Sequence, residues 1–156
     1  MANGPARLAA RPAVTPLHHA SEALALLLDD RVAAAEHTLR RALTASPPPP
    51  PAVRACLLSD LALCALHDSR PSEAVEALRH ALAVLPAART TSEDESAAHL
   101  SAARAQLSLN LCEALLIRGE LRQALRSATE AVALAQHALQ HAAPARRAAP
   151  PLMNTR

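Results

Sequence analysis

The sequence predicts an all-α protein. Alanine and leucine together make up 67 of the 156 residues, every one of the 16 basic residues is arginine, and phenylalanine, tyrosine and tryptophan are absent. Alanine, leucine, arginine and glutamate favour helices, whereas strands favour β-branched and aromatic residues, and the chain has only six valines and one isoleucine. An apolar fraction of 51% is too high for a disordered chain. One domain is expected at this length.

Proline defines the first part of the chain. Pro5, Pro12 and Pro16 keep the start irregular, so we expect residues 1–16 to be a disordered N-terminus. A first helix is expected from about residue 17 to 28, before the turn at Asp29-Asp30, and a second from about 31 to 45. Five consecutive prolines at 47–51 should form a short, stiff polyproline segment.

The middle of the chain predicts two further helices of similar length. The third covers about 52–67 and ends at the turn Asp68-Ser69-Arg70. Pro71 then suits the first turn of the fourth helix, over about 71–85. Pro86 ends that helix.

Two long helices are expected after an acidic loop at 87–95. Ser92 and Glu95 have the spacing of a capping box, which predicts a fifth helix over about 93–118. Gly119 supplies the next turn. The sixth helix should cover about 120–141 and end before Pro144, leaving 144–156 as a flexible basic tail.

One seven-residue pattern occurs three times, once in each pair of expected helices. Its members stand 3, 7, 12, 16, 19 and 24 residues after the first. They provide a small residue on the first helix, a packing residue one turn later, the turn itself, a stripe on the second helix and the end of the unit. The three copies are Ala23, Leu26, Asp30, Ala35, Leu39, Ala42, Pro47; then Ala62, Ala65, Ser69, Ala74, Leu78, Ala81, Pro86; then Cys112, Leu115, Gly119, Ala124, Ala128, Ala131, Gln136.

This pattern resembles the tetratricopeptide repeat, with copies at about 17–47, 55–86 and 105–138 inside a helical domain of residues 17–143. The family's usual aromatic residues are missing, and the proline run and the acidic loop lengthen the spacing between copies. In the first copy a register with Ala20, Leu24 and Leu27 inward stays open. The alternative fold is an irregular helical bundle.

The resemblance implies a short right-handed solenoid whose first helices line a concave face that binds a peptide or an amphipathic helix of a protein partner. Carried over copy by copy, it points to Leu24 and Leu28 in the first pair, Ser59, Asp60, Leu63 and His67 in the second, and Gln106, Leu109, Asn110, Glu113 and Ile117 in the third. The chaperone-binding members use a carboxylate clamp that includes lysine. This chain has no lysine, and Asp60 would repel a carboxylate, so we expect no chaperone binding of that type.

Composition and motifs argue against other classes of function. Residues 19–143 carry more acids than arginines, and no aromatic residue is available to stack on bases, so nucleic-acid binding is not expected. Phosphate loops and nucleophile elbows are absent, and the cysteines at 56, 64 and 112 form no metal motif, so we expect no catalytic site, metal or cofactor. His137 and His141 share a helix face, which we interpret as solvated because a third metal ligand is missing.

The sequence therefore favours a non-catalytic interaction module, as an adaptor or a small subunit of a larger assembly. A self-associating structural module, joined through residues 120–141, remains the alternative, as does a small protein that uses histidine or a metal. No apolar run is long enough to cross a membrane, and a cytoplasmic location is expected. A mitochondrial location directed by residues 1–20 is the alternative.

Overall fold

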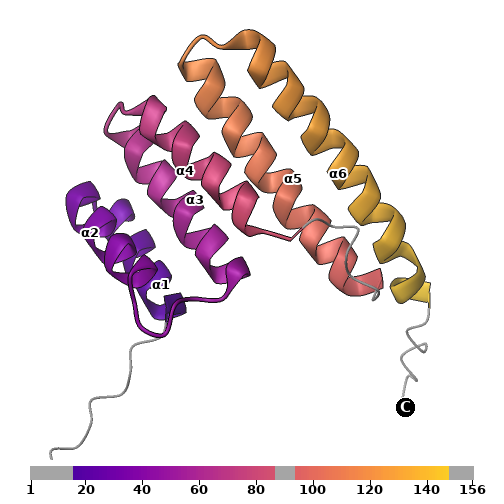
Figure 1. Cartoon of the computed structure of the whole chain (residues 1–156), viewed down its shortest axis with the longest axis horizontal. Helices are drawn as coiled ribbons and strands as arrows, with labels where there is room; N and C mark the ends of the chain where they lie inside the picture. The colour runs from indigo at the N-terminus through magenta and orange to yellow at the C-terminus, as the bar shows by residue number, and fades with distance from the viewer. Residues whose placement is uncertain (1–15, 87–93, 148–156) are drawn as a thin grey trace, which may run out of the picture.

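The computed structural model describes residues 16–86 and 94–147, and this part of the chain is entirely helical outside its turns. Six helices follow one another as three antiparallel pairs (Figure 1). The first pair is α1 (Pro16–Leu28) and α2 (Val32–Leu43), the second is α3 (Pro51–His67) and α4 (Pro71–Val84), and the third is α5 (Asp94–Ile117) and α6 (Leu121–Arg147). The all-α prediction is confirmed for these residues.

The three pairs turn in the same way. Asp30, Ser69 and Gly119 each adopt the left-handed conformation, with φ of 58°, 56° and 78°. In each turn the amide of the following residue donates to a carbonyl of the first helix, and that residue directly precedes the second helix. Such a turn satisfies carbonyls at the helix end that would otherwise lack donors. These backbone bonds are Arg31 N–H to Leu26, Arg70 N–H to Ala65 and Glu120 N–H to Leu115, with N···O distances of 2.8, 2.7 and 2.9 Å.

Small and aliphatic side chains at the pattern positions form the core. Five alanines of the pattern are buried: Ala23, Ala35, Ala62, Ala74 and Ala124. One core cluster lies between α1, α2 and α3, and a larger one lies between α3, α4, α5 and α6. Helix α3 contributes to both clusters through different faces, because its side chains point toward both neighbouring pairs.

The helices pack with one another in a regular order. Each packs against its neighbour in sequence, α1 also contacts α3, and α3 also contacts α5. The first helices of the three pairs therefore form a continuous layer in the described part of the chain.

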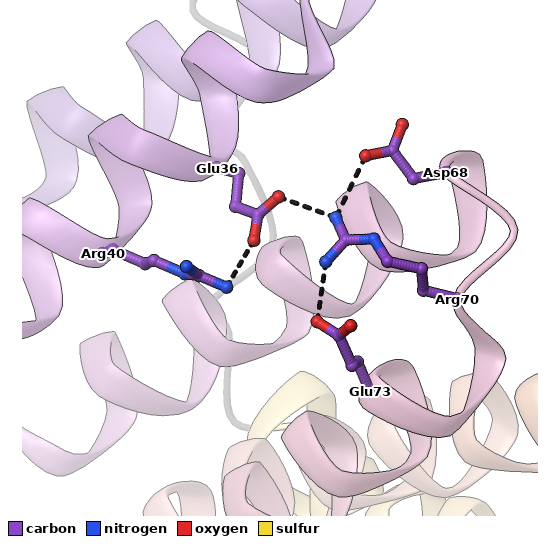
Figure 2. A network of polar contacts seen from close by, with 5 residues as sticks. All are labelled: Glu36, Arg40, Asp68, Arg70 and Glu73. Atoms are coloured by element: carbon purple, nitrogen blue, oxygen red, sulfur yellow. Dashed lines mark hydrogen bonds and ion pairs between the residues drawn. The ribbon is translucent and has the colours of Figure 1, made fainter.

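A charged cluster joins the first pair to the second. Arg70, at the start of α4, donates hydrogen bonds to Glu36 on α2 and to Asp68 and Glu73 beside it, at 2.7, 3.0 and 2.6 Å (Figure 2). Glu36 also pairs with Arg40 on its own helix. The bonds to Glu36 and Asp68 raise the pKa of Arg70, because they stabilise its charged form.

The third pair is attached to α4 by neutral acceptors. Arg104 on α5 donates to the carbonyl oxygens of Leu82 and Leu85, at 3.1 and 3.2 Å, so it binds groups at the C-terminal end of α4 that have no partner within the helix. Arg79 on α4 donates to Gln123 on α6 at 2.8 Å. Because these bonds come from three helices, they fix α5 and α6 relative to α4.

Several helix bounds differ from the predictions. Helix α3 begins at Pro51, one residue earlier than predicted, because proline suits the first helical position. The prediction that the sixth helix ends before Pro144 is wrong, since α6 runs to Arg147. Proline cannot donate to the carbonyl of Gln140, but that residue is exposed, so water can bind the carbonyl instead. The predicted disordered N-terminus, 1–16, is wrong at its last residue, since Pro16 begins α1. Residues 1–15, the cap residue Ser92 and the part of the predicted tail from 148 lie outside the described residues.

The first copy of the pattern has the register of the other two copies, with Ala23 inward. Ala23 is fully buried and Leu24 is half exposed, so the register with Leu24 inward is wrong. Ala20 and Leu27 pack at the edge of the same cluster. Leu24 is thereby free to take part in the predicted binding face.

Candidate functional site: the face of the first helices

The candidate site is the exposed side of the layer formed by α1, α3 and α5, which we call the first-helix face. Its apolar members are Leu24 and Leu28 on α1, Leu63 on α3 and Ile117 on α5, all of them exposed. They stand one or five residues after the first member of the repeated pattern, so each helix presents the same side. Glu113 takes the place of leucine on α5 and is also exposed.

Hydrogen bonds join two of the helices across this face. Asn110 on α5 donates to the hydroxyl of Ser59 on α3 at 3.2 Å, and Gln106 donates to the Asn110 side-chain oxygen at 2.9 Å. The structure therefore brings Ser59, Asn110 and Gln106 together, as the predicted face requires. Ser59 and Asn110 are half-buried, whereas Gln106 remains exposed at the edge.

His67 connects the end of α3 to the first turn. Its Nε2 lies 3.3 Å from Oδ1 of Asp30, and both side chains are at least half exposed. This partner was not predictable from the sequence, because Asp30 lies 37 residues earlier and its role as a turn residue does not reveal its neighbours. The pair links the end of α3 to the turn between α1 and α2.

Asp60 is the half-buried acid of the face. Burial raises the pKa of its carboxyl group, because the charged form loses water. Loss of water is the cause of this shift, and no hydrogen-bond donor or cation in the described part of the chain offsets it. A carboxylate that has lost hydration without gaining a donor is a strong acceptor for a partner's donor groups.

Two cysteines lie one turn on either side of Asp60. Burial, with smaller effects from Glu36 and Asp60, raises the pKa of the Cys64 thiol to about 11, so this fully buried group stays neutral. Desolvation and Asp60 also raise the pKa of Cys56, which is exposed on the first-helix face. Cys56 was not predicted as a member of the face, although it is equivalent in the repeat alignment to Gln106, which was predicted.

Leu109 has a different position from the other predicted residues. It lines a hollow of about 560 Å³ between α5 and α6, with alanines from both helices. Gln106 lines the same hollow and also bonds to Asn110, so it marks the boundary between the two surfaces. Leu109 thus lies at the free end of the helix array, beside the first-helix face.

The histidine pair of α6 is less exposed than expected. His137 is half-buried, and its Nδ1 lies 3.0 Å from the Ser101 hydroxyl on α5. The interpretation of this pair as a solvated face is therefore wrong for His137, because α5 extends far enough to cover it. In the described residues, no three side chains among histidine, cysteine, aspartate and glutamate are grouped as a metal site.

No helix in the described part of the chain combines the length and the apolar character needed to cross a membrane. No protein-family profile matches the chain, and no curated protein matches it either.

Proposed function

We propose that the chain is a non-catalytic protein-interaction module built from three tetratricopeptide-like helix pairs. Three features support this fold: the same left-handed turn in every pair, burial of the repeated small residues, and contacts from α1 to α3 and from α3 to α5. The first two involve positions of the one pattern that the chain repeats. The absence of aromatic residues is a departure from the family, and here leucine and alanine fill the core.

The first-helix face is the proposed binding surface. The observation that carries the proposal is the row of exposed apolar side chains, Leu24, Leu28, Leu63 and Ile117, at equivalent positions of three neighbouring helices. Exposed apolar side chains on neighbouring helices are typical of sites that bind a helix or an extended segment. Asp60 and Asn110 lie among these residues and would set the direction of the bound segment through its donor groups.

Paired affinity purification from native extract tests the proposal. One bait is the intact chain, and the second carries Leu63→Glu and Ile117→Glu, which place two charges on the face. The matched control carries Leu125→Glu and Leu139→Glu, which place two charges at exposed positions on α6. All three baits must show the same helical circular dichroism spectrum.

The proposal predicts a specific partner that the intact bait and the α6 control retain and the face variant loses. Retention of that partner by the face variant would show that binding occurs elsewhere. A partner lost only by the α6 control would assign binding to the end of the array and contradict the proposal.

A further inference from the structure

The outer side of α5 and α6 is an apolar surface. In each of the other two helix pairs, the next pair in the chain covers the equivalent side. We call it the end face. It consists of exposed and half-exposed residues on both helices, spaced alternately three and four apart. On α6 these are Leu121, Leu125, Ala128, Val132, Ala135 and Leu139, and on α5 they are Ala102, Ala105, Leu109, Cys112 and Leu116.

The repeated pattern identifies what such a surface normally contacts. Val75 on α4 and Leu125 on α6 occupy the same position, yet Val75 is 0% exposed and Leu125 is 70% exposed. Ser59 on α3 and Leu109 on α5 are also equivalent, and Ser59 meets α5 through Asn110, whereas Leu109 is 54% exposed. The residues that hold the next helix in the second pair are therefore uncovered in the third.

The end face is complementary to a reversed copy of itself. If a second α6 runs antiparallel to the first and the two cross near residue 130, Leu125 lies opposite Ala135 and Val132 lies opposite Ala128. If a second α5 crosses the first near residue 107, Leu109 lies opposite Ala105 and Cys112 lies opposite Ala102. Large side chains then face small ones in the middle of the end face, as close packing requires, and Leu121 faces Leu139 at each end.

The two crossing points lie at the same height in the molecule. The contact between Ser101 on α5 and His137 on α6 fixes the alignment of the helices. Six residues further along α5 and six back along α6, Leu107 is level with residue 131. One two-fold axis therefore satisfies both helices at once, as a symmetric dimer demands.

The hollow and the protruding side chains also match under this axis. The hollow of about 560 Å³ is lined mainly by alanines in the half of the end face far from the Gly119 turn. Leu116, Leu121 and Leu125 protrude near the turn. Antiparallel docking places Leu125 of each copy against the alanine-lined hollow of the other, where Ala135 lies.

We propose that a second copy of this chain binds the end face, forming a two-fold dimer in which α5 and α6 of both copies pack as four helices. The face between Leu121 and Leu139 is about 27 Å long and about 20 Å wide, so each copy covers roughly 540 Å² in projection. Because this area is near the lower end for specific interfaces, the dimer dissociates on dilution. The proposal is independent of whatever binds the first-helix face.

Sedimentation equilibrium of the full chain over a wide concentration range tests the dimer. The molar mass is expected to rise from one copy to two and no further. Leu125→Glu should keep the chain monomeric. Leu63→Glu, the same substitution on the first-helix face, should leave the dimer intact. A monomer at every concentration, a mass that grows beyond two copies, or a dimer that Leu125→Glu leaves unchanged would overturn the proposal.

A size exchange tests the register without introducing charge. Leu125→Ala should weaken the dimer by leaving a gap, and Ala135→Leu should weaken it by placing two leucines opposite each other. The double variant restores a large side chain opposite a small one and should recover most of the lost affinity. Additive losses in the double variant would overturn the proposed antiparallel pairing, and this test remains valid if Leu125→Glu fails to fold.

Discussion

The middle helix pair, α3 and α4, is covered on both sides, whereas the last pair, α5 and α6, is covered on one. The same repeated positions therefore have opposite surroundings. Val75 and Leu78 are core residues of α4, while Leu125 at the position of Val75 is a surface residue of α6. The difference arises from the helix that follows α4, since the local sequence is apolar at both positions. Burial in this molecule is decided by the order of the pairs.

The largest effect should separate the core of α4 from the surface of α6. Leu78→Ala removes a side chain that is 1% exposed, so we expect the free energy of unfolding to fall by about 2–5 kcal/mol. Leu125→Ala at a concentration where the chain is monomeric should change it by less than about 0.5 kcal/mol. Urea unfolding monitored by circular dichroism measures both, and equal losses would contradict the assigned burial.

A smaller effect should appear at the turns, where the three pairs are alike. Gly119 has φ of 78° and no atom near the place of a Cβ, so Gly119→Ala introduces backbone strain without a clash. We expect a loss of about 1 kcal/mol. Ser69→Gly removes the equivalent strain in the middle pair and should stabilise the chain by a smaller amount. The same unfolding assay applies, and stabilisation by Gly119→Ala would contradict the left-handed turn.

The junction between the first two pairs should be sensitive to salt, unlike the junction between the last two. Glu36→Gln removes the acceptor that holds Arg70 across the junction, and a lower melting temperature is expected. Added salt should reduce the difference from the parent chain, because it screens the ion pair. A double-mutant cycle with Arg70→Gln isolates the interaction. If the two substitutions are simply additive, the contact contributes nothing to stability.

The smallest effect concerns Asp60 and depends on pH. Its pKa is higher in the folded chain than in the unfolded chain, so ionisation of Asp60 lowers stability above the folded pKa. Asp60→Asn should therefore raise the melting temperature at pH 7. The gain should fade as the pH falls through the folded pKa and be absent below about pH 3, about one unit under the usual aspartate pKa, where the carboxyl is protonated in both states. Melting curves across this pH range measure it, and a gain independent of pH would contradict the role of desolvation.

Local rules were enough to predict most of the helices from the sequence. Proline and turn residues act within a few positions, so the ends near Leu28, His67 and Gly119 could be placed to within a residue or two. The end of α6 could not, because tolerance of Pro144 depends on the exposure of the carbonyl four residues earlier. Burial of Ala23 and Ala62 followed from the repeated pattern, which encodes contacts inside each pair.

The candidate site was only partly predictable for the same reason. Ser59 and Asn110 were assigned to one face by repeat alignment, and their hydrogen bond agrees with that assignment. The pairing of His67 with Asp30 depends on how two helix pairs meet, which no local pattern describes. Leu109 was assigned by the same alignment, but its surroundings depend on whether another helix follows α6.

Methyl NMR during dilution tests most directly whether the end face and the first-helix face are separate surfaces. The account predicts that dilution of the intact chain shifts the signals of Leu121, Leu125, Val132 and Leu139, as the second copy leaves. The signals of Leu24, Leu28, Leu63 and Ile117 should stay in place. Shifts confined to the first-helix face, or no shifts at all, would contradict the claim that the end of the array is a docking surface for a second copy.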